Sequence, residues 1–248
     1  MTPDLTAAAT RAAVHELGGA FAEDPKTLRQ ARQLGLTGWS FYVAGRGGAL
    51  GDVRPDTVAA ALGFIAPDAV RDGWETARRI IPPSEVAEHH LAECCRWGRE
   101  RLDVFHGVDR LVDLAERVVL AADPAGLTLF AAWRTMPMPE DGPGARAAVV
   151  AKLLREYRSG AHLLAIRAGG LTPLEALIAS TEGEAAAVAY GWQPPFPPFE
   201  PLLRRRIRAD LVTDRIVGEA YQTLDVTERV ELARLLDESV DHLQVPVP

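Results

Sequence analysis

One face of a predicted helix in the second half of the chain carries two arginines and a histidine. Arg155, Arg158 and His162 follow one another at spacings of three and four residues, which places them on the same side of a helix. Such a face can hold an anionic ligand, and a buried imidazole on it can act as a general acid or base. The alternative is that His162 only fixes a contact between helices. We name His162 as the candidate catalytic residue and keep both interpretations open.

Other aromatic and basic residues extend this candidate site. Trp39 and Trp192 occupy similar places in the two halves of the chain, where large aromatic side chains can form the wall of a pocket. Arg46 is the one side chain of the glycine-rich segment 45–51 that could point into such a site. We therefore predict a pocket for a small-molecule ligand, lined by Trp39, Tyr42, Arg46, Tyr157, Arg158 and His162.

The sequence offers little for a metal or a nucleotide. His90 and Cys94, like Glu85 and His89, are four residues apart and could chelate zinc, and one histidine could bind haem iron. No second pair of cysteines or histidines exists to complete four ligands, so we predict no metal site. The glycines of segment 45–51 do not form the dinucleotide-binding pattern, and no Walker motif follows them. The cofactor, if any, is left unknown.

A basic run at Arg204, Arg205, Arg206 and Arg208 is the candidate nucleic-acid contact. Arginines in that position could reach phosphates or a minor groove. Against this, the formal net charge is −7, whereas phosphate binding needs positive charge. Glu182 and Glu184 also begin the helix that would read bases, and no Arg, Asn, Gln or Lys follows them there. DNA is a partner that the sequence allows but does not favour.

Helix-forming residues dominate the elements that must position these groups. Ala, Leu, Arg and Glu are abundant and only 6 % of residues are aromatic, which favours a mainly α fold. Residues 145–168 form the clearest amphipathic helix, and Thr172 begins another with proline at its first position and an acid at its third. Residues 204–213 are the one candidate strand or wing of the second half. The linker at 136–144, rich in proline and glycine, predicts two modules, 1–135 and 145–248.

Two phrases recur in the two modules. Leu34-Gly35-Leu36-Thr37 parallels 169–172, and Ala60-Ala61-Leu62-Gly63-Phe64 parallels 188–192. One interpretation is an internal duplication, so that one chain would imitate a two-fold dimer. The other is that Gly-Leu-Thr is a common way of entering a helix.

The second module resembles MarR-type winged helix-turn-helix domains. The residues that carry this resemblance are GLTPLEALIAS, then AYGW, then LVTDRIVGEAYQTLD. The whole chain is also similar to an actinobacterial family described as helix-turn-helix-like and of unknown function, through FYVAGRGGALGDV (41–53) and LLREYRSGAHLLAI (153–166). The resemblance implies two winged-helix-like modules with small β wings. It also implies a cleft between them, where MarR-like proteins take small aromatic ligands.

Cysteine content and the lengths of the apolar segments bear on the cellular compartment of the protein. The two cysteines are adjacent, so no disulfide framework is expected and the compartment is predicted to be reducing. No signal peptide and no apolar run of spanning length is recognised, which predicts a cytoplasmic protein, monomeric or homodimeric, without a membrane partner.

Three functions remain open from the sequence. The first is a small-molecule-binding protein with a pocket between the modules and weak or lost DNA binding. The second is an enzyme of specialised metabolism that uses the same pocket with His162 as acid or base. The third is a MarR-type transcriptional regulator.

Overall fold

The computed structural model describes residues 1–140 and 142–244, and within them the fold is entirely helical. The first part of the chain forms α1 (Pro3–Ala9), α2 (Arg11–Leu17), α3 (Pro25–Gln33), α4 (Gly38–Gly47), α5 (Pro55–Leu62) and α6 (Pro67–Arg78). The middle forms α7 (Pro83–Leu102), α8 (Val108–Ala121), α9 (Thr128–Arg134) and α10 (Pro143–Ala168). The last part forms α11 (Pro173–Ile178), α12 (Gly183–Ala189), α13 (Glu200–Tyr221) and α14 (Val226–Gln244). No helix among the described residues is long and apolar enough to span a bilayer.

The mainly α prediction is confirmed, but the expected β wings are wrong. Residues 204–213, predicted as a strand or wing, lie inside α13, and the described residues contain no strand. The burial pattern gives the reason. Leu202, Ala209 and Thr213 are buried while Leu203 and Ile207 are exposed, which is the periodicity of a helix with one face on the core. Arg and Leu are also strong helix formers, so the arginine run extends a helix instead of a strand.

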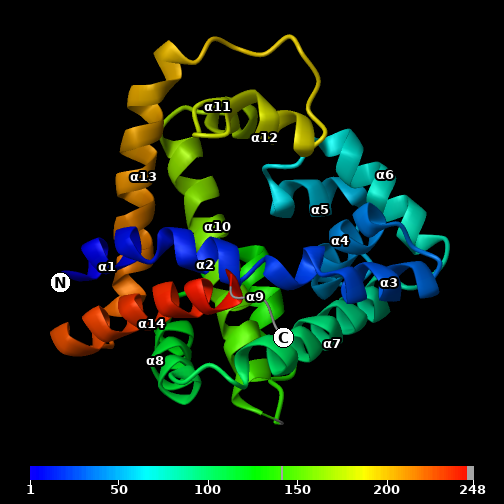
Figure 1. Cartoon of the computed structure of the whole chain (residues 1–248). Coiled ribbons are helices and arrows are strands. Elements are labelled where there is room, and N and C mark those ends of the chain that lie inside the picture. The colour runs from blue at the N-terminus through cyan, green and yellow to red at the C-terminus, as the bar shows by residue number, and fades with distance from the viewer. Residues whose placement is uncertain (141, 245–248) are drawn as a thin grey trace.

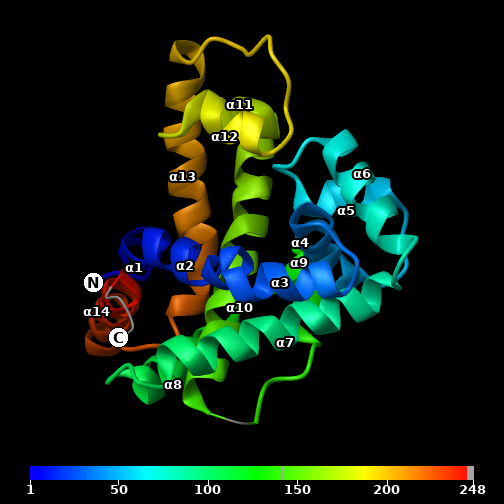
Figure 2. The same ribbon diagram turned by 45° about the vertical axis from the view of Figure 1, so that its right-hand side comes forward.

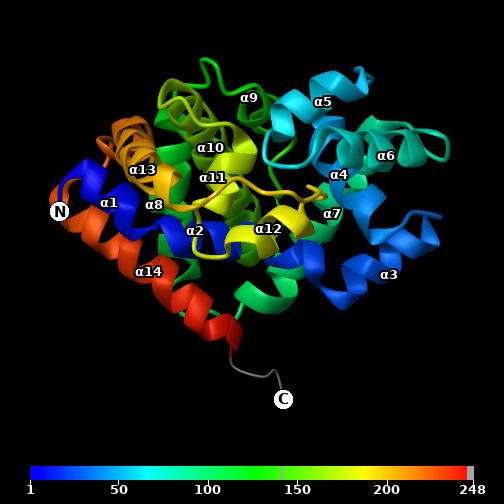
Figure 3. The same cartoon turned by 90° about the horizontal axis from the view of Figure 1, so that it is seen from above.

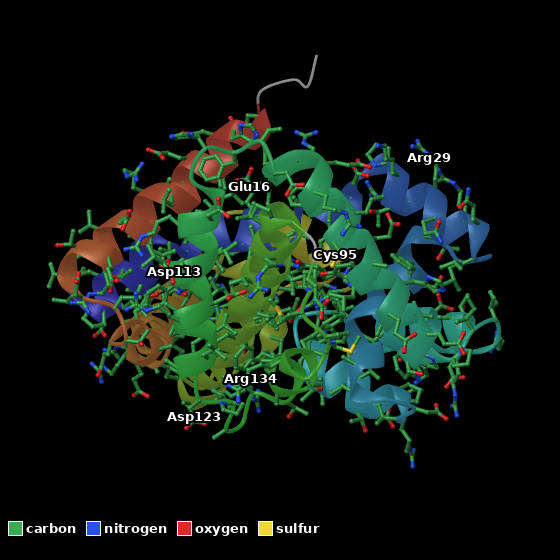
Figure 4. The ribbon with its side chains drawn as sticks, turned by 90° about the horizontal axis from the view of Figure 1, so that it is seen from below. Glu16, Arg29, Cys95, Asp113, Asp123 and Arg134 are labelled. Carbon is green, nitrogen blue, oxygen red and sulfur yellow. The ribbon has the colours of Figure 1, made fainter. Side chains whose placement is uncertain are left out.

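The helix α10 runs through the middle of the molecule, with α13 beside it (Figures 1 and 2). The long helix α7 crosses α10, and the two backbones come closest where Gly98 faces Gly144. A Cβ on Gly98 would lie 2.3 Å from the carbonyl oxygen of Gly144, so only hydrogen fits there. Figure 4 shows α7 and α8 from below, with Cys95 on the first and Asp113 on the second. This crossing fixes the lower part of α10.

Two hydrophobic cores are present, and α10 contributes to both. The main core takes residues from α1 to α10 and again from α13 and α14. The small core contains the last turns of α10, together with α11, α12 and the first half of α13, which form the upper part of Figure 1. The predicted linker 136–144 includes residue 141, which lies outside the described residues. The division into modules 1–135 and 145–248 stays a prediction.

The first recurring phrase, at 34–37 and 169–172, has the same local structure in both places. Gly35 and Gly170 both have positive φ, 77° and 72°, and each is followed by a threonine that caps the next helix. Thr37 caps α4 and Thr172 caps α11, both in a capping box with the residue three positions later. The predicted start of the helix at Thr172 is confirmed. The internal duplication stays a prediction.

The loops that follow α5 and α12 touch each other. The amide of Ala66 donates to the carbonyl of Tyr190 at 2.9 Å, and the indole N–H of Trp192 donates to the carbonyl of Phe64 at 2.8 Å. Seen from above, α12 lies on the side of the molecule that faces α4 and α5 (Figure 3). We call this contact between residues 63–66 and 190–192 the seam.

Candidate ligand cavity

A cavity of about 1050 Å³ lies between the main core and the small core. Its wall is formed by α2, by α5 and the residues after it, by the start of α9, by α10, by the region of α11 and α12, and by α13. The volume is at the upper end of the range for small-molecule sites. Phe64 and Tyr190 belong to its wall, so the seam closes one side of the cavity.

Charged and apolar side chains share the cavity wall. The arginines are Arg11, Arg46, Arg155, Arg158, Arg167 and Arg206, and the carboxylates are Glu16, Glu156, Glu182 and Asp210. Aliphatic and aromatic side chains make up most of the rest. A concave, mostly apolar surface with a few placed polar groups is typical of a ligand site.

The floor of the cavity is a buried network around Glu156. The Nε and Nη2 of Arg46 donate to its two carboxylate oxygens at 3.0 and 2.8 Å, and the Nη1 of Arg46 donates to the hydroxyl of Tyr42 at 2.9 Å. Burial raises the pKa of Glu156, but Arg46 and Lys152 outweigh burial and hold the pKa well below its usual range. This carboxylate is therefore charged at neutral pH.

Lys152 completes the network from inside the core. Its Nζ lies 3.5 Å from the Oε1 of Glu156 and 3.3 Å from the ring centroid of Trp133. Burial lowers the pKa of Lys152 to about 8, against the raising effect of Glu156. The indole N–H of Trp133 donates to the carbonyl of Arg46 at 2.9 Å, so α9 is tied to α4 and α10 at this point.

His162 lies in the wall with one ring nitrogen fixed. Thr213 donates its hydroxyl proton to the carbonyl of Ala209 at 2.8 Å, so its oxygen accepts from the Nδ1 of His162 at 2.9 Å. The other nitrogen, Nε2, is buried and has no hydrogen-bond partner among the described residues. The ring stacks on Phe64 with a centroid distance of 5.6 Å.

The environment of His162 keeps it uncharged. Burial first, and then Arg206 and Arg158, lower its pKa to about 3. An imidazole with this pKa is a weak base at neutral pH and has no proton to give from Nε2. It is suited to accepting a hydrogen bond. The catalytic role of His162 stays a prediction.

We expect His162 to make the protein less stable in mild acid. Its pKa is about 3 in the folded state and near 6.5 in the unfolded chain, so the unfolded state takes up a proton first as pH falls below 6.5. The contribution of uncharged His162 to the free energy of unfolding is fully present above pH 6.5 and is lost progressively toward pH 3. The loss between pH 7 and pH 5 is about 2 kcal/mol. In urea denaturation at both pH values, His162→Asn should remove this loss. The same change at the exposed His106 is the control, and an equal loss in wild type and His162→Asn would contradict the prediction.

The predicted ligand residues divide into two groups. Arg46, Arg158 and His162 line the cavity, and Tyr42 does not line it but accepts a hydrogen bond from Arg46. Two others lie in the surrounding structure. The indole of Trp39 donates to the carbonyl of Ala69 at 3.0 Å, and Tyr157 donates to the carbonyl of Ile216 at 3.1 Å.

Sequence reasoning missed several wall residues. Glu156 stands on another face of an ideal helix from His162, yet it too lines the wide cavity. Arg155 was grouped with His162 by its helical spacing but was not included among the ligand residues. The wall supplied by His15 and by residues 59–65 had no signal in the sequence.

The arginines of the predicted nucleic-acid contact lie on α13. Arg204, Arg205 and Arg208 are exposed, whereas Arg206 turns toward the cavity and pairs with Asp210 at 3.1 Å. They belong to a helix, as described above, and their role as nucleic-acid contacts stays a prediction.

The region considered for metal is a buried part of the core. His90 packs between aromatic rings, 4.7 Å from the ring centroid of Phe21 and 5.8 Å from that of Trp133. Burial raises the pKa of the Cys94 thiol well above its usual range. Within residues 1–140 and 142–244, no group of three or more His, Cys, Asp or Glu side chains is arranged to hold a metal ion.

Comparison with known proteins identifies a family for this chain. A family model described as a helix-turn-helix family covers residues 7–196, which is more than half of the chain. No curated protein and no solved structure matches the chain.

Proposed function

Because the chain belongs to this helix-turn-helix family, we propose that it is a family member that binds a small molecule and whose DNA binding is weak or lost. The ligand site is the cavity between the main core and the small core. The observation that carries the proposal is the cavity itself, with its large volume and its mixed apolar and charged wall.

The helix-turn-helix unit best suited to DNA is α11 and α12, which are joined by a short turn over residues 179–182. In such units the second helix enters the major groove. The exposed residues of α12 and the turn before it are Thr181, Glu182, Glu184, Ala185, Val188 and Ala189. Two of them are acidic and none is basic, so this surface repels phosphates. This supports a structural role for α11 and α12 in place of sequence-specific DNA binding.

The alternative of an enzyme in the same cavity has less support. It depends on His162 as the acid or base, and the pKa of about 3 leaves this imidazole a poor proton acceptor at neutral pH. The alternative of a MarR-type regulator depends on DNA binding, which the acidic surface of α12 opposes.

Ligand binding is tested on the purified protein by native mass spectrometry and by a thermal-shift screen of metabolites. At about 100 times its Kd, a ligand adds about 2.7 kcal/mol to the free energy of unfolding, which raises the Tm of a chain of this size by about 5–10 °C. Ala60 lines the cavity, so Ala60→Trp should remove the shift. Ala92→Trp, on the exposed side of α7, should keep it. A shift that survives Ala60→Trp would place the ligand elsewhere and overturn the proposal.

DNA binding is tested by gel retardation with the fragment upstream of the protein's own coding sequence. We expect no retarded complex even at low salt. A complex whose affinity falls steeply with salt, and which Arg204→Ala with Arg208→Ala weakens, would support the regulator instead.

A further inference from the structure

We propose that the ligand of this cavity is an amphipathic anion, whose acidic group is held by Arg155 and whose apolar part lies against α5 and the upper half of α10. This inference rests on the proposed function, because it names the chemistry of the molecule that the same cavity takes.

The arginines of the cavity wall differ in whether a carboxylate of the protein pairs with them. Arg46 pairs with Glu156 and Arg206 with Asp210. Arg158 and Arg11 both reach Asp214, at 2.7 and 2.9 Å. Each of these four guanidinium groups therefore has a carboxylate partner within the protein.

The remaining two arginines have no carboxylate partner among the described residues, and they lie in different surroundings. Arg167 is exposed to solvent and donates to the carbonyl of Leu171 at 3.3 Å. Arg155 is partly buried and its guanidinium lies near the Tyr42 hydroxyl, but its Nε is buried without a hydrogen-bond partner among the described residues. A partly buried cation without a counter-charge can form a strong charge-assisted hydrogen bond, and an anion in the cavity would supply the partner.

The surroundings of Arg155 add positive charge. Its guanidinium carbon would lie 3.1 Å from a Cβ on Gly19, at the end of α2 and near His15. Burial, and after it Arg155, Arg46 and Arg158, lower the pKa of His15 to about 4, so all three arginines lie close enough to act on this end of the cavity. A negative group entering here gains chiefly from Arg155, the one of these three arginines without a carboxylate partner among the described residues, in a partly desolvated place where electrostatic attraction is strong.

The other part of the cavity is apolar. Leu62, Phe64, Leu127, Phe130, Leu163 and Leu164 form its wall. The eight residues from Arg155 to Leu163 advance about 12 Å along α10. Gly63 meets the far end of this stretch, since a Cβ on it would lie 2.4 Å from the Cδ2 of Leu163. A ligand that satisfies both parts has a negative head and a hydrophobic body about 10 Å long.

The test uses two fluorescent probes that differ only in charge. 1-Anilinonaphthalene-8-sulfonate carries a sulfonate, and N-phenyl-1-naphthylamine is the same molecule without it. Both are titrated into the folded full-length protein at 0.15 M salt. For Arg155→Met we expect the Kd of the anionic probe to rise about tenfold or more, because a charge-assisted hydrogen bond is lost. The Kd of the neutral probe should change less than about twofold.

Two further variants separate charge from shape. Arg155→Lys keeps the positive charge and should retain most of the affinity for the anionic probe. Arg167→Met removes the other unpaired arginine of the wall and should leave both probes nearly unchanged. Far-UV circular dichroism and the Tm establish that each variant is folded. If Arg155→Met does not fold, the comparison of Arg155→Lys and Arg155→Gln decides the question, since only the second loses the charge.

The outcomes distinguish this inference from the proposed function. If both probes bind in a way that Ala60→Trp abolishes, yet Arg155→Met weakens neither or both equally, the anionic head is wrong and the cavity remains a ligand site. If neither probe binds, or if Ala60→Trp leaves both unaffected, the proposed function fails together with the inference. Selective loss of the anionic probe in Arg155→Met supports both.

Discussion

Glu156→Gln is expected to lower the free energy of unfolding by about 3–5 kcal/mol, because breaking a buried ion pair by removing one partner leaves the other charge uncompensated. Glu156 is 2 % exposed and is the one carboxylate that pairs with both Arg46 and Lys152 among the described residues. Glutamine has nearly the same volume, so the change removes charge without opening a cavity. Arg46 then keeps a buried charge without its counter-charge, and Lys152 loses the carboxylate that raises its pKa.

Urea denaturation at pH 7 measures the loss. The matched control is Glu116→Gln, which breaks the half-exposed pair with Arg146 and is expected to cost about 0–1 kcal/mol, as surface ion pairs do. The buried network would be of minor importance if both variants lost the same small amount.

Trp133→Ala is expected to lower the free energy of unfolding by about 3–5 kcal/mol, the range for truncating a large buried aromatic side chain. Trp133 is 2 % exposed. Its removal also leaves the carbonyl of Arg46 without its donor and takes the aromatic ring away from the ammonium of Lys152, which loses a cation–π contact. The loss therefore combines a cavity with an unsatisfied polar group.

Thermal and urea unfolding of two more variants separate these contributions. Trp133→Phe keeps a ring but no N–H, and we expect it to cost about 1–3 kcal/mol, the penalty for a buried acceptor left unpaired. Trp39→Ala removes a tryptophan that is only partly buried and should cost less than Trp133→Ala. An equal cost for the two alanine variants would show that Trp133 acts only as one more hydrophobic residue.

The start of a helix could be predicted from the sequence where neighbouring residues cap it. Thr172 with its following proline and glutamate begins a helix as expected. These signals lie within a few residues of each other, so a single sequence contains them. The prediction of a strand or wing at 204–213 was wrong because the buried positions of this segment are spaced as in a helix.

The glycine-rich segment shows a second limit. The glycines of segment 45–51 match no nucleotide-binding pattern, and in the structure Gly45 and Gly47 belong to the last turn of α4 inside the core. A Cβ on Gly45 would lie 2.4 Å from the ring of His90, so this glycine is required by a close approach to α7. Such a requirement depends on which helix packs opposite, and this cannot be seen in one stretch of sequence.

The candidate site was predictable to the same extent. The spacing of Arg155, Arg158 and His162 on one helix was enough to bring them to one cavity wall. The opposite wall from α5 and the missing carboxylate partner of Arg155 emerge only when distant segments meet. The spacing along one helix therefore identified side chains that line the cavity. Tertiary packing determined which of them is left without a partner in the protein and can bind a ligand.

The seam has a consequence for how the cavity responds to protein abundance. The loops at 63–66 and 190–192 belong to one polypeptide and hold each other through two hydrogen bonds. Where two subunits must associate to enclose a site, dilution opens that site. Here both loops belong to one chain, so the closing of the cavity wall does not depend on protein concentration. It is the same in a cell that holds a few copies of the protein as in one that holds thousands.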